Sequence, residues 1–441
     1  MGTRSASGQP ASAPVPDCPQ DPALRYVLAV GAVSAGLFLA DTGHDGDIDV
    51  SPTGESAEPV VCDARARAVA HSWGIEPAGE PGQSGGPGTV VVLVDGLGLE
   101  MLRQRRGHTP TLRRWLAQRE TAPVGTGAGI LTCRPSTTAA ALTMLGTSAL
   151  PGTTGMVGYS VLNPRLGPAL GPSAVPGPDQ VLSLITWKGD NVPSPRSWQD
   201  VPTIFERLPA GSAVSIGPTR FAGSGLTEAA LRGASHLGAD RLEDRPGLAA
   251  GALRRGTPLV YLYVGELDKT GHKHGWLSEQ WLAQLERLDA AMAELVRRVP
   301  AGTRILLSAD HGMVDTDPDH RIDLSAHREL VRDVVAVAGE PRLTHLHVAC
   351  DADLAAEVAQ RYRHVLGERA MWIGTREQTG EHLGALGARA RGVVGDVVVA
   401  MAENWVLVDP RVHSESAIAM PGVHGSFTPA ETEVPLLITE A

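Results

Sequence analysis

Three apolar segments of the chain each lead to an acidic residue. The segment 90–94 (VVVLV) is followed at once by Asp95, the segment 259–264 (LVYLYV) leads to Asp268, and the segment 305–308 (ILLS) leads to Asp310. A single aspartate after a strand usually forms a turn or caps a helix. Three carboxylates at one edge of a sheet would instead repel each other strongly unless cations neutralised them. The pattern therefore indicates a metal centre.

Two of these acids are accompanied by histidine. His272 lies four residues after Asp268, so that both side chains share one face of a helical turn and can meet one ion. His311 directly follows Asp310. These two neighbours can converge only if the chain turns sharply, and Gly312 supplies the flexibility for such a turn. The spacing at both places therefore fits metal ligation.

A third histidine, His424, lies in the Gly- and Pro-flanked segment PGVHGSFTP, shortly before the last apolar run. By itself it would be an ordinary loop histidine. Mixed aspartate and histidine ligation without cysteine is typical of a catalytic Zn²⁺ site, with Mn²⁺ or Fe as alternatives. The four cysteines are far apart, with no CxxC pair, and indicate neither a disulfide framework nor a cysteine-built metal site: Cys18, Cys62, Cys133 and Cys350.

A cluster of hydroxyl side chains, Ser136, Thr137 and Thr138, precedes the small-residue segment 139–145. This segment is expected to form a helix. A hydroxyl at a helix N-terminus either caps the helix or attacks phosphorus while backbone N–H groups hold the oxyanion. Capping is the more common role of such a cluster, so the residues alone leave both interpretations open.

The elements that would position these residues follow from the apolar pattern. Continuous apolar runs are typical of buried parallel strands, and they recur at residues 90–94, 213–216, 259–264, 305–308, 397–400 and 435–438. Amphipathic segments lie between several of them, most clearly at 277–299. This alternation predicts an α/β fold with a mainly parallel sheet covered on both sides. In such sheets, ligands bind beyond the carboxyl ends of the strands.

Composition limits the class of protein. The chain has 441 residues, 42% hydrophobic content and a net charge of -11, which disfavours a nucleic-acid polymer as partner. We expect an N-terminal extension over residues 1–84, partly disordered and ending in the Gly/Pro-rich linker 77–88. A catalytic domain over 85–441 is expected to follow, with an irregular excursion around 150–202. The apolar run 26–40 favours a buried helix or strand over an export signal or a membrane anchor. We therefore expect a cytoplasmic protein without a stable membrane anchor.

Taken together, the motifs resemble those of the alkaline phosphatase superfamily, in its type I phosphodiesterase/nucleotide pyrophosphatase branch. They occur in the family's order from residue 89 to the C-terminus: VDGLG, PSTTAAALTMLGT, ELDKTGHKHG, SADHGM and PGVHGSFTPAETEVPLLI. The resemblance implies a three-layer α/β/α sandwich and a two-metal hydrolase that cleaves phosphodiester or pyrophosphate bonds. The implied substrate is a small-molecule phosphate ester or a nucleotide-like compound.

Carried over by position, the resemblance assigns one metal ion to Asp268, His272 and His424. It assigns the second to Asp95, Asp310 and His311, with the nucleophile as a further ligand. The nucleophile aligns best with Thr138, because the family has a second threonine nine residues later, as Thr147 is here. Thr137 and Ser136 are the alternatives. The expected covalent intermediate is a phosphothreonine.

Two departures from the family's pattern bear on the substrate. Nucleotide-cleaving members carry an asparagine three residues after the nucleophile, where this chain has Ala141. The sulfatase pattern C-x-P-x-R begins at Cys133 but has Thr137 in place of the arginine, which excludes a sulfatase. A phosphomonoesterase or a phosphonate C–P hydrolase on the same metal site remains an alternative. So does a non-catalytic binding protein of the same fold.

Overall fold

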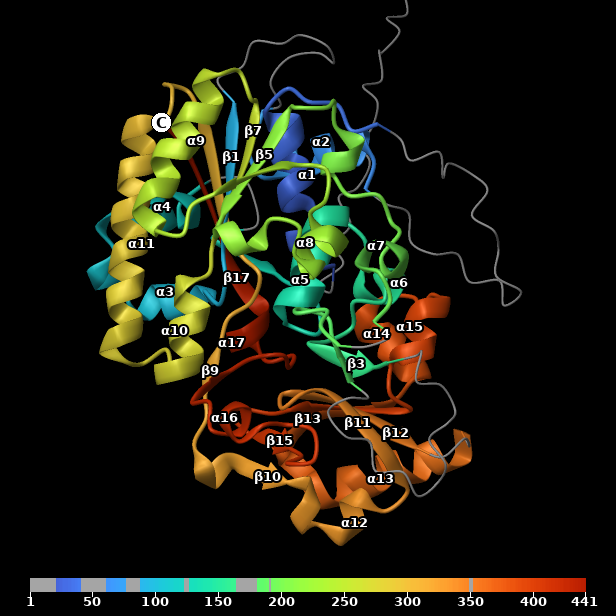
Figure 1. Cartoon of the computed structure of the whole chain (residues 1–441). Helices are drawn as coiled ribbons and strands as arrows, with labels where there is room; N and C mark the ends of the chain where they lie inside the picture. Colours follow the sequence, from blue (N-terminus) through green and yellow to red (C-terminus); the bar gives the residue numbers. More distant parts are fainter. Residues whose placement is uncertain are drawn as a thin grey trace, which may run out of the picture.

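The computed structural model describes residues 21–40, 61–76, 88–122, 127–163, 181–189, 192–348 and 352–441. A seven-stranded sheet forms its centre (Figure 1). The strands lie in the order β2 (Gly129–Leu131), β17 (Glu433–Glu440), β8 (Arg304–Ala309), β1 (Thr89–Val94), β7 (Leu259–Val264), β5 (Ala213–Gly217) and β6 (Ser235–Gly238). The five strands from β8 to β6 are parallel. The predicted mainly parallel sheet is confirmed.

The direction of one strand in this sheet differs from the prediction. The apolar run 435–438 lies in β17, which pairs antiparallel with β8 and with β2. Pro435, Leu436 and Leu437 of the run are nevertheless buried, as the apolar pattern suggested, and Ile438 is half-buried. An apolar run reports burial on both faces of a strand and carries no information on strand direction.

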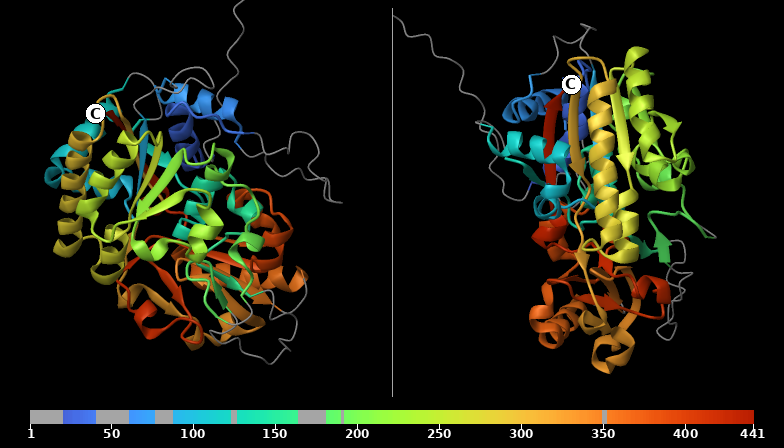
Figure 2. Two further views of the ribbon diagram at one scale, coloured as in Figure 1. Left: turned by 45° about the horizontal axis from the view of Figure 1, so that its top comes forward. Right: turned by 90° about the vertical axis from the view of Figure 1, so that its left-hand side faces the viewer.

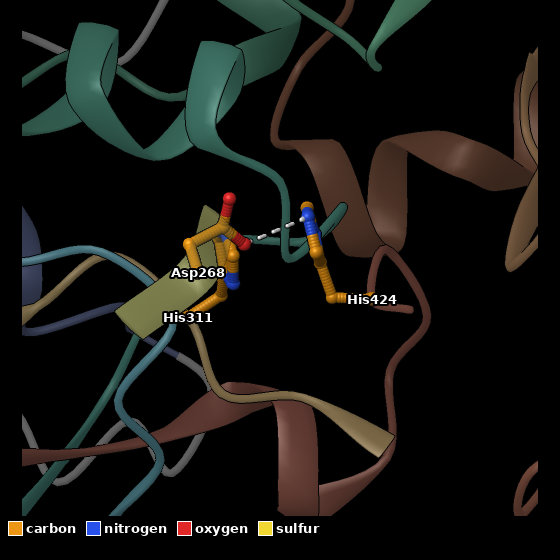
Figure 3. Close-up of side chains that lie close together, drawn as sticks. All are labelled: Asp268, His311 and His424. Carbon is orange, nitrogen blue, oxygen red and sulfur yellow. Dashed lines mark ion pairs between the residues drawn. The ribbon is translucent and has the colours of Figure 1, made fainter. Parts of the chain in front are cut away.

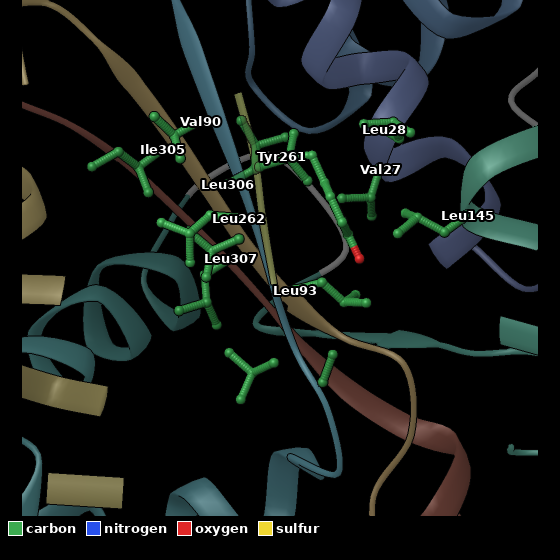
Figure 4. Packing of buried hydrophobic residues seen from close by; sticks show 14 of the residues in the cluster. Val27, Leu28, Val90, Leu93, Leu145, Tyr261, Leu262, Ile305, Leu306 and Leu307 are labelled. Atoms are coloured by element: carbon green, nitrogen blue, oxygen red, sulfur yellow. The ribbon is translucent and has the colours of Figure 1, made fainter. Parts of the chain in front are cut away.

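Helices cover both faces of the sheet. On one face, α4 (Pro110–Glu120), α9 (Arg245–Arg254) and α11 (Glu279–Arg298) pack together. On the other, α1 (Leu24–Ser34) packs on β1 and β8 and against α5 (Thr138–Thr147), which also contacts α8 (Gly225–Ala230). Figure 4 shows Val27 and Leu28 of α1 and Leu145 of α5 beside the strands. The three-layer α/β/α architecture is confirmed.

Two of the predicted segments contain helices. The segment 277–299 contains α11, whose N-cap Ser278 accepts a hydrogen bond from the backbone of Trp281. The apolar run 26–40 overlaps α1, and all eleven residues of that helix are buried. None of the helices in the described part of the chain combines the length and the apolar character needed to cross a membrane.

A smaller antiparallel sheet gathers with its helices at one end of the molecule (Figure 2). Its strands lie in the order β11 (Val334–Glu340), β12 (Leu343–Val348), β14 (Val397–Met401) and β13 (Ala370–Thr375), with α13 (Ala352–Leu366) packed against it. The run 397–400 was expected among the buried parallel strands. It instead forms β14, which pairs antiparallel with both of its neighbours.

The chain enters and leaves this smaller sheet through one two-stranded ribbon. β9 (Val314–Asp315) pairs antiparallel with β16 (Gly422–Val423). This pairing returns the chain to the large sheet directly before His424 and close to His311. A segment of about a hundred residues thus lies between His311 and His424 in the sequence, yet the two predicted ligands stay close in space.

The remaining elements are short. Within 150–202, the described residues form α6 (Pro151–Thr154), β3 (Ser160–Leu162), β4 (Val181–Ser183) and α7 (Pro195–Trp198). Elsewhere lie α2 (Asp63–Ser72), α3 (Leu99–Gln104), α10 (Glu266–His274), β10 (Arg321–Asp323), α12 (Arg328–Val331), α14 (Gly380–Leu383), α15 (Ala388–Val393), β15 (Val406–Val408), α16 (Glu415–Ile418) and α17 (Pro429–Thr432). Residues 1–20 and 77–87, which include most of the predicted disordered segment and linker, lie outside the described residues. The predicted domain boundary at residues 84–85 stays a prediction.

Candidate metal centre

The three predicted aspartates meet at one edge of the large sheet. Strands β8, β1 and β7 are neighbours and parallel, so that their carboxyl ends lie side by side. Asp95 follows β1, Asp310 follows β8, and Asp268 lies in the first turn of α10, just beyond β7. The sheet therefore brings together three acids that are far apart in the sequence.

Asp95, Asp310 and His311 form a buried group. The Nε2 atom of His311 lies 3.4 Å from Oδ1 of Asp95 and 3.5 Å from Oδ2 of Asp310. One ligand atom from each of the three residues lies within 4.8 Å of the others. This spacing allows all three side chains to bind a single ion.

A second group forms around Asp268. Its Oδ1 atom lies 3.7 Å from Nε2 of His424 and 3.2 Å from Nε2 of His272. Asp268, His311 and His424 again offer ligand atoms within 4.8 Å of one another (Figure 3). The rings of His311 and His424 are stacked, with their centroids 3.6 Å apart. His311 therefore lies between the two groups, which makes them one continuous site.

The hydrogen bonds of the histidines indicate how their rings are oriented. The Nδ1 atom of His272 lies 2.8 Å from the carbonyl oxygen of Gly422, and that of His424 lies 3.0 Å from the carbonyl oxygen of Ser136. A carbonyl oxygen only accepts, so Nδ1 donates in both rings, and Nε2 is the ring atom left to bind an ion. In both rings Nε2 faces Oδ1 of Asp268, at 3.2 Å for His272 and 3.7 Å for His424. Backbone carbonyls of this kind commonly orient metal-binding histidines.

The carboxylate groups of the site have buried oxygens without a hydrogen-bond partner among the described residues, which favours a bound cation. These oxygens are Oδ1 of Asp95, Oδ1 of Asp268 and Oδ2 of Asp310. Burial, and then the charges of Asp310 and Asp268, raise the pKa of Asp95 well above its usual range. Burial and the neighbouring rings of His311 and His272 lower the pKa of His424 well below its usual range. A set of closely spaced carboxylates and imidazoles fits divalent cations.

Of the three predicted hydroxyls, Thr138 reaches this site. It is the first residue of α5, and its Oγ1 atom lies 3.1 Å from Nε2 of His311. Ser136 donates its hydroxyl hydrogen to the carbonyl of Ser426, and Thr137 donates its own to the carboxyl group of Glu340. The hydroxyls of Ser136 and Thr137 are therefore hydrogen-bonded away from the site. The hydroxyl of Thr138 faces the two groups of candidate metal ligands.

Two glycines allow the close packing of this centre. Gly96 has a φ of 74°, and a Cβ atom there would lie 3.0 Å from Cα and Cβ of Asp268. Gly312 was expected to permit a sharp turn, but its φ angle is not positive. A Cβ atom on Gly312 would instead lie 2.0 Å from the carbonyl oxygen of Ala430. A side chain at either position would push the ligand-bearing segments apart.

Sequence reasoning missed the residues that support the ligands. The hydroxyl of Tyr263, on β7, donates a short hydrogen bond to Oδ2 of Asp95. A half-buried tyrosine near the carboxyl end of a strand needs a partner for its hydroxyl, and this was the only signal in the sequence. The segment 150–202 also contains three aromatic residues, Tyr159, Trp187 and Trp198. Of these, Trp198 is buried and packs edge-on against Trp187, while Tyr159 is exposed.

A buried ion pair holds the loop that carries His424. Arg342, in the turn between β11 and β12, donates to both carboxylate oxygens of Glu431, at 3.1 and 2.6 Å. Both side chains are fully buried. The carboxylate of Glu431 also accepts a hydrogen bond from the backbone N–H of Ser426, at 3.0 Å. The backbone carbonyl of Glu431 accepts one from the backbone N–H of Gly312, at 2.9 Å. The pair thus joins the smaller sheet to the two loops of the metal centre.

We expect Glu431→Gln to destabilise the protein by about 3–5 kcal/mol, because it leaves the Arg342 charge buried without a counter-charge. The free energy of unfolding from denaturant titration measures this loss. Glu433→Gln, two residues away at an exposed position, serves as the matched control and should change stability little. Equal stabilities of the two variants would contradict this role of the ion pair.

Comparison with known proteins places this site in a class. The model of the type I phosphodiesterase/nucleotide pyrophosphatase family matches residues 89–427. The chain belongs to this family, a metal-dependent group, and is a hydrolase acting on phosphoric ester or related bonds. Comparison with curated protein sequences gives no match.

Solved structures share the fold. The phosphonoacetate hydrolase of Sinorhizobium meliloti 1021, in complex with phosphonoformate, is 18% identical with a TM-score of 0.57, and the match covers 80% of this chain and 89% of that one. Murine ectonucleotide pyrophosphatase/phosphodiesterase 5 is 15% identical with a TM-score of 0.57, and the match covers 79% and 87%. At these identities the likeness shows a common alkaline-phosphatase-like fold.

Proposed function

We propose that this chain hydrolyses a phosphodiester or pyrophosphate bond of a small molecule through a phosphothreonine formed on Thr138. One observation carries the proposal. The Thr138 hydroxyl lies 3.1 Å from Nε2 of His311, the residue that lies between Asp95 and Asp310 on one side and Asp268 and His424 on the other. A hydroxyl in that position can be activated and can face a phosphate bound by the same ions.

The residues present would hold two divalent cations, for which we propose Zn²⁺. One would be bound by Asp95, Asp310, His311 and Thr138, and the other by Asp268, His272 and His424. When bound, such ions lower the pKa of an attacking hydroxyl and neutralise the charge that develops on phosphate oxygens. Asp268 and His272 lie four residues apart on α10, which keeps both on one face of the helix.

The chain's own groups would then carry the reaction. The Thr138 oxygen forms a bond to phosphorus and releases its proton to solvent, and the bond from phosphorus to the leaving oxygen breaks. The leaving oxygen takes up a proton from water. A water molecule then forms a bond to phosphorus and gives up a proton. The bond from phosphorus to the Thr138 oxygen breaks, and that oxygen takes up a proton to restore the hydroxyl. The N-terminus of α5 points its positive end at the phosphate, which favours the negative charge there.

Ala141 bears on which substrate is bound. It is fully buried in the first turn of α5, and its methyl group offers no hydrogen-bond donor to a phosphate oxygen. The backbone N–H groups of that turn therefore take on a larger share of oxyanion binding in this chain. We propose a small phosphate ester or nucleotide-like compound as substrate.

The test is hydrolysis of bis-p-nitrophenyl phosphate beside p-nitrophenyl phosphate and phosphonoacetate, with metal analysis of the same sample. We expect preference for the diester, with about two zinc ions per chain. Preference for the monoester would make the protein a phosphatase, and cleavage of phosphonoacetate alone would make it a phosphonate hydrolase. A protein that binds no metal would contradict the site assignment.

A further inference from the structure

Glu340 is a buried acid that lies beside the candidate metal centre without belonging to it. It is the last residue of β11, in the smaller sheet, and its side chain is only 6% exposed. Its Oε2 atom accepts a hydrogen bond of 2.8 Å from the hydroxyl of Thr137, the residue directly before the proposed nucleophile. An acid from the inserted segment thus contacts the start of α5.

The same carboxyl group packs against the loop of His424. A Cβ atom on Gly425 would lie 2.6 Å from Cδ of Glu340, so only glycine fits at that position. Gly425 has a φ of 130°, which also favours glycine. Its carbonyl oxygen accepts from the backbone N–H of Ser136, at 3.3 Å. Glu340 is therefore enclosed between the segment that leads to Thr138 and the loop that carries a predicted metal ligand.

The hydroxyl of Thr137 bonds Glu340 instead of capping the N-terminus of α5. Thr137 is the N-cap of α5 and has extended backbone angles, yet its side chain makes no cap bond to the helix. A threonine at this position normally accepts from an N–H group of the first turn. Because its hydroxyl is directed to Glu340, the first-turn N–H groups of α5 are left for another acceptor, such as a phosphate oxygen.

We propose that Glu340 is a positioning residue: through its hydrogen bond with the Thr137 hydroxyl it fixes the start of α5 and thereby orients Thr138. This inference rests on the proposed function. Burial raises the pKa of Glu340 to about 8, while the Thr137 hydrogen bond acts in the opposite direction.

The test uses a double-mutant cycle in the metal-loaded enzyme. Thr137→Val keeps the shape of the side chain but removes the hydrogen bond, and Glu340→Leu removes the acceptor. We expect each to lower kcat about tenfold, the effect of one hydrogen bond, with KM and metal content little changed. The double variant should lose no more than either single one, because both changes remove the same interaction.

Conservative variants separate positioning from a merely structural role. Thr137→Ser keeps the hydroxyl and Glu340→Gln keeps an acceptor, so both should retain kcat within about threefold of the wild type. Additive losses in the double variant, or wild-type kcat in Thr137→Val and Glu340→Leu, would overturn the inference. If those variants are fully active while Thr138→Ala is inactive, only this inference fails. If Thr138→Ala is active, the proposed function fails.

Discussion

Replacement of Thr138 with alanine is expected to abolish turnover while the protein keeps its metal ions. The hydroxyl lies 3.1 Å from His311 Nε2, and both metal-ligand groups retain their aspartates and histidines without it. Loss of a nucleophile lowers kcat by at least about 10³-fold in enzymes with covalent intermediates. Steady-state kinetics and metal analysis of the purified variant measure the two effects. The pair of results separates a chemical role from a structural one.

Ser136→Ala is the matched control for this experiment. Ser136 lies two residues away and donates its hydroxyl hydrogen to the Ser426 carbonyl, so its removal should cost some stability and leave most of the turnover. Wild-type turnover in Thr138→Ala would contradict the assignment. A dead Ser136→Ala or Thr137→Val variant would then identify the alternative nucleophile.

Replacement of Asp268 with asparagine is expected to remove one metal ion and almost all activity. Asp268 is the only acid in its ligand group, where it lies beside the Nε2 atoms of His272 and His424. Without its charge, only the two imidazoles of His272 and His424 remain for a divalent cation. We expect metal content to fall from about two ions to about one per chain, and kcat to fall by more than about 10³-fold. Retention of two ions would contradict the proposed ligand set.

The same substitution should raise the thermal stability of the metal-free protein. In the absence of cations, the charge of Asp268 repels Asp95 and contributes to raising the pKa of that carboxyl group. Removing the charge relieves this repulsion, so after chelation Asp268→Asn should melt at a higher temperature than the wild type. With metal present, the order should reverse, because only the wild type gains the full binding energy. Asp317→Asn, at an exposed acid bonded to His320, is the control.

The sequence was informative about the large sheet and the acids at its edge. Strands buried on both faces read as apolar runs, and parallel neighbours must bring their carboxyl ends together, so Asp95 and Asp310 could be placed near each other. The spacing of Asp268 and His272 likewise predicted one helical face, and α10 has it. These inferences depend on local pattern and on the geometry of a parallel sheet.

Other features depend on contacts between distant segments, for which the sequence carries no local signal. The run 397–400 looks like the strands of the large sheet, yet it belongs to the smaller antiparallel one, because burial alone does not specify a partner strand. Glu340 reaches Thr137 across 203 positions of the chain. Tyr263 reaches Asp95 across 168. Supporting residues of this kind become visible only when the fold brings them beside the ligands.

The covalent intermediate on Thr138 is the central claim, and the stereochemical course at phosphorus tests it most directly. A chiral phosphorothioate diester is hydrolysed in isotopically labelled water, and the configuration of the product is determined by NMR. Two successive in-line displacements, first by Thr138 and then by water, predict net retention of configuration. Net inversion would mean that water attacks the substrate directly, and would contradict the account.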